Sequence, residues 1–160
     1  MPDKIDKLGS LPVSAESLEQ HPNFSRFSPA ELKALSGHCV LKTLSGGKVL
    51  FTEGEQGQAM FIVRKGSIKI LKMGFLGETG IGEVNVGEFF GEMAVIDGSP
   101  RMATARAAVD TELLELSAEA YAKLQKDNPQ TAVKIMDLLL RLLTQRLRSV
   151  TVKMLKKTTK

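Results

Sequence analysis

The segment that decides the fold of this chain is Gly91-Glu92-Met93-Ala94-Val95-Ile96-Asp97-Gly98-Ser99-Pro100-Arg101-Met102-Ala103-Thr104. The glycine at position 91 lets the backbone approach a ligand closely, and the residues from Glu92 to Ile96 suffice for about one and a half helical turns. The first amides of such a helix have no partner within it and carry the positive end of its dipole, so they favour an anion. Arg101 supplies a guanidinium that can meet two phosphate oxygens at once. The segment therefore predicts a phosphate-binding site.

Glu92 adds a requirement of its own, because a carboxylate beside a phosphate repels it unless a specific donor faces the acid. A free ribose 2′-hydroxyl is such a donor. A sugar whose 3′ and 5′ oxygens close a ring on phosphorus would satisfy Glu92, Arg101 and the amides together, which indicates a 3′,5′-cyclic nucleotide. The alternative is an ordinary ion pair between Glu92 and Arg101 that holds the loop.

The surrounding sequence, from Val40 to Ser117, consists of short alternating runs separated by glycine. This pattern is typical of β-strands, and closely spaced short strands favour a barrel or jelly roll over an open sheet. We expect a hairpin turn at Lys65-Gly66. The expected strands cover residues 49–52, 59–64, 67–72, 82–86, 103–108 and 111–116.

Helices are expected on both sides of the strands. Ser28-Pro29-Ala30-Glu31 forms a capping box with proline at the first helical position, which predicts a short helix that turns Leu32 and Leu35 inward and stops at Gly37. Residues 1–27 are expected to be a loosely helical lead-in. Ser117 with Glu119 predicts a further helix that bears Tyr121 and Leu124, and Asn128-Pro129 begins a much longer one.

The glycine-rich run Gly77-Glu78-Thr79-Gly80-Ile81-Gly82 is superficially similar to a dinucleotide-binding fingerprint. Such a fingerprint must follow a parallel strand and open a helix, and no helical pattern follows these residues. We expect a flexible hairpin loop here.

Length and composition bound the class of protein. A chain of 160 residues with 42% hydrophobic residues can form one domain with one core. Cys39 is the single cysteine, so an intramolecular disulfide is excluded, and with only His21 and His38 beside it we expect no structural zinc site. No signal peptide is evident, and apolar runs such as 59–63 are far too short to span a bilayer. We expect a soluble, cytoplasmic protein.

In the long helix, apolar residues recur at spacings of three and four, which is typical of a two-helix seam. A second stripe lies off this seam and is expected to face the strands, which leaves the seam for a partner and predicts a homodimer. The seam consists of Val133, Met136, Leu140, Leu143, Leu147, Val150 and Met154, and the second stripe of Ile135, Leu138, Leu139 and Leu142.

The net charge of +4 is concentrated at one end, because residues 141–160 hold seven Lys or Arg and no acid. These cations could attract nucleic acid or an anionic membrane, but cations late in a helix more often complement its negative end and remain solvated. We expect no direct DNA binding and no membrane span.

The cassette, from Phe90-Gly91-Glu92-Met93-Ala94 to Gly98-Ser99-Pro100-Arg101-Met102-Ala103-Thr104, resembles the phosphate-binding cassette of cyclic nucleotide-binding domains. The resemblance extends through residues 46–51 and 61–70 and covers about residues 20–155. It implies an eight-stranded β-roll with flanking helices, Glu92 on the ribose and Arg101 on the phosphate. The amides of Gly91, Met93, Ala94 and Met102 would complete the anion hole, with Ala103 beside them.

Two positions depart from the family pattern. Cassettes that favour cyclic GMP often carry Thr or Ser after the arginine, and Met102 offers no hydroxyl, so the resemblance favours cyclic AMP, with cyclic GMP as the alternative. In bacterial activators of this family the long helix covers the base with a threonine and a serine, whose positions are taken here by Arg146 and Leu147. Arg146 is expected either to contact the base or to be a flanking charge whose stem covers the seam, while Leu143 or Leu147 closes the lid.

The leading hypothesis is a regulatory cyclic-nucleotide sensor that signals through movement of its C-terminal helix to an unknown downstream protein. The alternative is a ligandless dimerisation or interaction module with the same fold. The sequence shows no nucleophile paired with a general base, no metal-binding cluster and no P-loop. We therefore expect no enzyme activity and no cofactor beyond the nucleotide ligand. The expected organisation is a lead-in at 1–27, the β-roll with flanking helices at 28–127, and the long helix with its basic tail at 128–160.

Overall fold

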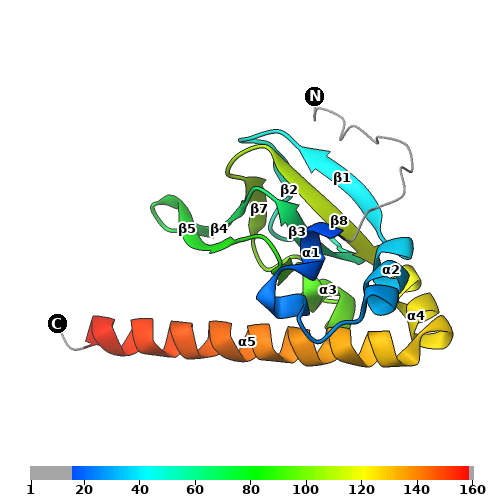
Figure 1. The fold of residues 1–160 in the computed structure, drawn as a ribbon. Coiled ribbons are helices and arrows are strands. Elements are labelled where there is room, and N and C mark those ends of the chain that lie inside the picture. Colours follow the sequence, from blue (N-terminus) through cyan, green and yellow to red (C-terminus); the bar gives the residue numbers. More distant parts are fainter. Residues whose placement is uncertain (1–15, 159–160) are drawn as a thin grey trace.

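The computed structural model describes residues 16–158, which form a β-roll lying on a long helix (Figure 1). Within this range, the strands make two four-stranded sheets with the orders β1-β8-β3-β6 and β2-β7-β4-β5, and all neighbours are antiparallel. The predicted β-roll is therefore confirmed. The strands are β1 (Val40–Leu44), β2 (Val49–Phe51), β3 (Ala59–Lys65), β4 (Ile68–Gly74), β5 (Gly77–Val84), β6 (Phe89–Phe90), β7 (Thr104–Ala107) and β8 (Thr111–Ser117).

The helices begin at the caps that the sequence indicates. The Glu31 amide donates to Ser28 Oγ at 3.2 Å and the Ser28 amide donates to Glu31 Oε2 at 2.8 Å, which completes the capping box of α2. Ser117 Oγ accepts from the Ala120 amide at 3.0 Å and caps α4. The helices are α1 (Glu16–Glu19), the 3₁₀ turn η1 (Pro22–Phe24), α2 (Pro29–Gly37), α3 (Glu92–Asp97), α4 (Ala118–Asp127) and α5 (Pro129–Thr158).

The lead-in is helical where the structure describes it, in α1 and η1, and residues 1–15 lie outside the described range. Leu32 and Leu35 of α2 are buried, as predicted. These short helices pack on the outer face of one sheet and close one side of the core.

The central strands β3 and β8 of the sheet β1-β8-β3-β6 have buried side chains on both faces, since side chains alternate along each strand. On β3, Phe61 and Val63 point into the roll and contact residues of the second sheet. Met60 and Ile62 point the other way, into a cluster made with the helices. One face of this sheet thus shapes the interior of the roll and the other face anchors α5.

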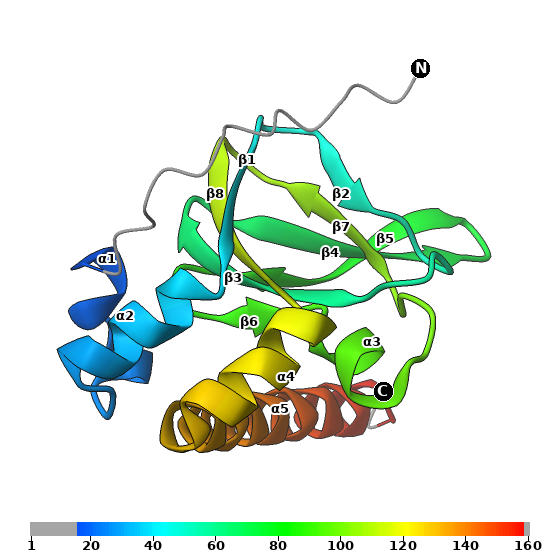
Figure 2. The ribbon, with the colours of Figure 1, turned by 90° about the vertical axis from the view of Figure 1, so that its right-hand side faces the viewer.

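Helix α5 uses its second apolar stripe to dock on the rest of the chain. Ile135, Leu138, Leu139 and Leu142 are all buried in the cluster shared with the outer face of the sheet, which confirms the predicted role of this stripe. Tyr121 Oη of α4 donates to the Ala132 carbonyl at 3.1 Å and ties the two C-terminal helices together. Figure 2 shows α4 and α5 beneath the roll, and α5 continues past it in Figure 1.

Two local predictions are wrong. The run Gly77–Gly82 is not a loop, because it lies in strand β5, which pairs with β4 from Ile68↔Val84 to Gly74↔Gly77. Its glycines reduce strand propensity, but the backbone ladder with β4 outweighs that preference. The strands β1 and β6 were not among the expected runs, since β6 has only two residues and β1 is only partly buried along most of its length.

The turn at Lys65-Gly66 exists but does not make a hairpin. β3 pairs with β6 and β8, whereas β4 pairs with β5 and β7 in the other sheet. Gly66 has φ +81, and a Cβ there would lie 2.6 Å from the Asp110 carbonyl oxygen and from Thr111 Oγ1. The glycine therefore lets the chain cross from one sheet to the other against the turn before β8.

Candidate functional site

The cassette begins where β6 ends and α3 starts. Gly91 is the N-cap of α3 with φ 72, a left-handed conformation that favours glycine, and no side chain caps this helix end. A Cβ on Gly91 would lie 2.7 Å from Arg101 Nη1. Helix α3 ends at Gly98, which also has a positive φ of 71. The predicted short helix is confirmed, and its glycine start brings the backbone against Arg101.

Arg101 is buried within the roll, with 7% of its surface exposed. Its Nη1 donates to the Gly91 carbonyl at 2.9 Å and its Nη2 donates to the Ala59 carbonyl at 2.8 Å. Its Cζ lies 4.1 Å from the centroid of the Phe51 ring. These contacts use two of the five N–H donors of a guanidinium, so the side chain can also donate to an anion.

Arg101 is partly desolvated and lies near three carboxylates. Burial lowers the pKa of its guanidinium below the ordinary value, while the nearby carboxylates of Glu55, Glu115 and Glu92 act in the opposite direction. The guanidinium borders a cavity of about 280 Å³, whose wall includes the Phe51 and Phe61 rings and also the carboxylates of Glu55 and Glu115. A phosphate that reached Arg101 would meet a desolvated cation, where charged hydrogen bonds are strong.

The end of the cassette is held against the loop between β2 and β3. The Gly54 amide donates to the Arg101 carbonyl at 2.8 Å, and the Arg101 amide donates to the Glu55 carbonyl at 2.7 Å. Because C=O and N–H point in opposite directions in a trans peptide, the first bond directs the Met102 amide away from this loop. The backbone donor that the resemblance assigns to the anion hole is thus fixed in orientation.

A lysine from the second sheet binds the backbone of the cassette next to Arg101. Lys72 Nζ donates to the Met102 carbonyl at 2.6 Å and to Glu53 Oε1 at 2.6 Å. The hydrogen bond from Lys72 lowers the pKa of the Glu53 carboxyl below its ordinary value, so this carboxylate stays ionised at neutral pH. The Glu53 amide also donates to Thr104 Oγ1 at 3.0 Å.

Glu92 is buried at the first turn of α3, with 3% of its surface exposed. Its partner is Arg146 of α5, whose Nη1 lies 3.2 Å from Glu92 Oε1. Arg146 Nη2 also donates to the Phe89 carbonyl. The expected alternative of a Glu92–Arg101 ion pair is therefore wrong, and so is the interpretation of Arg146 as a flanking charge, because its side chain reaches across to the cassette.

The structure brings together only some of the predicted site residues. Gly91, Glu92 and Arg101 surround the junction of β6 and α3, with Ala94 and Ala103 buried nearby. The side chains of Met93, Met102 and Leu147 are exposed, and Leu143 is half-buried. Of the three predicted lid residues Leu143, Arg146 and Leu147, Arg146 is the one that contacts the cassette in the described structure.

Residues outside the cassette that contact the Arg101 guanidinium were not predicted from the sequence. A Cβ on Gly57 would lie 2.3 Å from Arg101 Cζ, so this glycine leaves room for the guanidinium. Phe51 and Ala59 complete this support through the ring contact and the carbonyl described above. The available signal was the Glu53-Gly54-Glu55-Gln56-Gly57 loop, which combines two acids and two glycines between two strands.

In the part of the chain that the structure describes, no helix is both long enough and apolar enough to cross a membrane.

The fold and the cassette define a class of protein, and comparison with known families gives the same class. The family model described as "Cyclic nucleotide-binding domain" matches residues 41–128, which is more than half of the chain. This chain belongs to the cyclic nucleotide-binding domain family.

Individual relatives are similar over most of the chain. A cAMP-dependent protein kinase regulatory subunit of Mycosarcoma maydis is 32% identical over 108 residues, which are 64% of this chain and 21% of that protein. A cyclic AMP receptor protein of Thermus thermophilus is 33% identical over 125 residues, which are 78% of this chain and 58% of that protein. This chain therefore spans less than two thirds of the length of either relative.

Among solved structures, a cyclic nucleotide-binding domain from Methylobacillus flagellatus superposes with a TM-score of 0.82 at 30% sequence identity. The match covers 89% of this chain and 83% of that one.

Proposed function

We propose that this protein is a regulatory sensor that binds a 3′,5′-cyclic nucleotide and does not catalyse a reaction on it. The observation that carries the proposal is the buried Arg101 guanidinium, which faces a cavity from within a cassette of the cyclic nucleotide-binding family. Arg101 donates to the Gly91 and Ala59 carbonyls, and its remaining N–H donors would bind the ligand phosphate.

The proposed ligand would be shared between the cassette and the long helix. Arg101 would bind the phosphate together with the amides of Gly91, Met93, Ala94 and Met102, with Ala103 alongside. The Glu92 carboxylate would accept a hydrogen bond from the ribose 2′-hydroxyl. The base would lie toward α5, whose proposed lid residues are Leu143, Arg146 and Leu147. Arg146 contacts Glu92 in this structure, so contact with the base would require its side chain to move.

Cyclic AMP is the proposed ligand, with cyclic GMP as the alternative. Met102 lacks the hydroxyl that often bonds guanine at this position. Two relatives carry cyclic AMP in their names, a kinase regulatory subunit and a receptor protein. Both features support adenine over guanine.

The proposed output is a change in the position of α5. Ligand would bind preferentially to one arrangement of the cassette and α5 and so shift a pre-existing equilibrium. The seam of α5 would hold a second copy of the chain, and a downstream protein would detect the change. A cytoplasmic location fits a sensor of intracellular nucleotides.

Calorimetry tests the proposal. Wild-type protein should release or take up heat with cyclic AMP, and Arg101→Ala should weaken binding by at least about tenfold, because charged hydrogen bonds contribute about 1.5–3 kcal/mol each. Arg106→Ala is the matched control, since Arg106 pairs with Glu78 on the second sheet, outside the cassette. Absence of binding to both cyclic AMP and cyclic GMP would refute the proposal.

One observation favours a second candidate, a ligandless interaction module. Glu92 already has Arg146 as its partner, and Arg101 already donates to two carbonyls, so both side chains are satisfied without a nucleotide. A melting temperature that does not change at saturating nucleotide would favour this module, because any ligand that prefers the native state must raise it.

A further inference from the structure

Arg146 connects α5 to the cassette at two points. One nitrogen of its guanidinium pairs with the Glu92 carboxylate, and the other donates to the Phe89 carbonyl in β6. These partners lie on both sides of Gly91, so a single side chain of α5 spans the junction between β6 and α3. Arg146 is 54 residues from Glu92 in the sequence, so the contact depends on the docking of α5.

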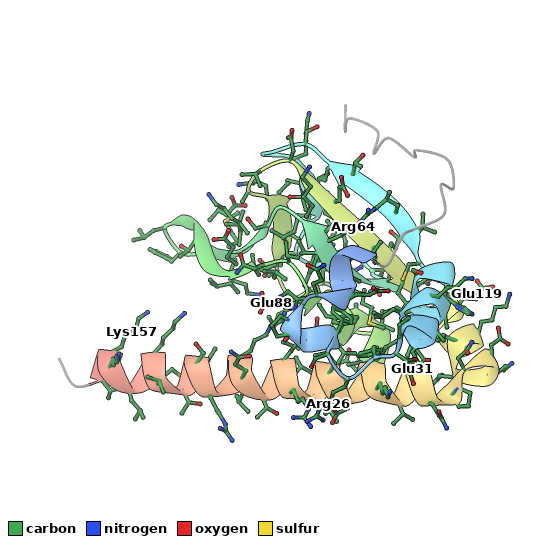
Figure 3. The ribbon with its side chains drawn as sticks, viewed as in Figure 1. Arg26, Glu31, Arg64, Glu88, Glu119 and Lys157 are labelled. Carbon is green, nitrogen blue, oxygen red and sulfur yellow. The ribbon has the colours of Figure 1, made fainter. Side chains whose placement is uncertain are left out.

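The contact lies where the buried face of α5 gives way to an exposed segment. Leu142 is buried, Leu143 and Arg146 are half-buried, and residues 147–158 are exposed. Figure 1 shows this end of the helix running past the roll, and Figure 3 shows Lys157 near its tip. Loss of the Arg146 contacts would remove the hydrogen bonds from this side chain to Glu92 and to the Phe89 carbonyl.

The Glu92 carboxylate is covered in this conformation, because its side chain is only 4% exposed. A buried carboxylate needs a partner, and Arg146 is the cation paired with it among the described residues. A ribose hydroxyl can reach Glu92 only after part of this cover moves.

We propose that Arg146 is an autoinhibitory latch that occupies the sugar-binding acid of the ligand-free protein, so that the ribose 2′-hydroxyl and Arg146 compete for Glu92. This inference rests on the proposed cyclic-nucleotide site. Binding exchanges one partner of Glu92 for another and releases the Arg146 side chain from the cassette. A partner that holds α5 on the cassette should lower the affinity for the nucleotide. By linkage, the nucleotide should lower the affinity for that partner by the same factor.

The test compares cyclic AMP with 2′-deoxy cyclic AMP, which lacks only the competing hydroxyl. In wild-type protein the hydrogen bond from the 2′-hydroxyl to Glu92 forms only when the Glu92–Arg146 pair breaks. The two dissociation constants should therefore agree within about threefold. In Arg146→Met the hydroxyl has no competitor, and the ratio of the two constants should rise to about tenfold or more. Arg146→Gln should give an intermediate ratio, and circular dichroism should show that both variants are folded.

Arg141→Met is the matched control, because Arg141 pairs with Asp137 on α5 itself, and it should keep the wild-type ratio. Binding of both nucleotides with the same ratio in wild type and Arg146→Met refutes the latch and leaves the sensor intact. Binding by Arg146→Met alone supports the latch. No binding by any variant refutes the cyclic-nucleotide site, and the latch with it.

Discussion

At the level of single residues, the site depends on a close approach between a glycine and a guanidinium. Arg101 is enclosed by the Phe51 ring on one side and by two main-chain carbonyls on another, which leaves it little freedom to move. Gly57 lies against the guanidinium as well, where even one methyl group would overlap it. The orientation of the phosphate-binding cation therefore depends on a residue that would not touch the ligand.

Gly57→Ala should displace Arg101 and weaken cyclic-nucleotide binding by about tenfold, because the added Cβ would lie 2.3 Å from Arg101 Cζ. Gly57 has no positive φ, so backbone strain is not the cause. Gly37→Ala, at a position with no atoms within 4 Å, is the control and should bind as wild type does. Calorimetry measures both, and wild-type affinity in Gly57→Ala would contradict the proposed role of Arg101.

At the level of elements, an ion pair joins the N-terminal helix α2 to α5. Lys134 Nζ donates to Glu31 Oε2 at 2.6 Å and to the Arg26 carbonyl at 2.8 Å. Figure 3 shows Glu31 and Arg26 near the part of α5 that the rest of the chain covers. Glu31 also completes the capping box of α2, so one carboxylate both begins one helix and binds another.

This carboxylate predicts a pH dependence of stability. The hydrogen bond from Lys134, with that from the Ser28 amide, lowers the pKa of Glu31 below its ordinary value of 4.5. A carboxyl whose pKa is lowered by folding contributes stability above its unfolded pKa and loses it as the pH falls through the folded pKa. Between about pH 5 and about pH 3, wild type should lose more unfolding free energy than Lys134→Met, by less than about 1 kcal/mol.

Urea unfolding at each pH measures this difference. Lys33→Met, at an exposed position of α2, is the control and should follow the wild-type pH dependence. Equal pH dependence in wild type and Lys134→Met would show that the pair does not stabilise the docking of α2 on α5.

At the level of the whole molecule, α5 has one apolar face buried and another exposed. Val133, Leu140, Leu147 and Met154 of the predicted seam are each 64–67% exposed. Such a stripe on a helix is unfavourable in water and is typical of an interface. Because the other stripe already holds the roll, the seam is left for a second copy of the chain.

Leu140→Glu should convert a dimer into a monomer, because it places a charge in the middle of the seam. Sedimentation velocity at several concentrations measures the change. The far-ultraviolet circular dichroism spectrum should stay the same, because Leu140 is exposed and does not belong to the buried core. Gln145→Glu, at an exposed position on the other side of α5, should remain dimeric. A monomeric wild type, or a dimeric Leu140→Glu, would contradict the proposed interface.

Local patterns in the sequence determined strands β2, β3, β4, β7 and β8, the capped starts of α2 and α4, the short helix of the cassette and the two stripes of α5. Each of these depends on residues within a few positions of one another, through side-chain alternation, helical spacing or a cap. The tertiary structure alone decided that Lys65-Gly66 joins opposite sheets, because β3 and β4 pair with strands that are distant in the sequence. Gly77–Gly82 is a strand because it forms a hairpin ladder with the neighbouring strand β4, which its glycine content does not indicate. The tertiary structure also decided that Glu92 pairs with Arg146 rather than with Arg101, because the docking of α5 brings together two charges that lie 54 residues apart in the sequence.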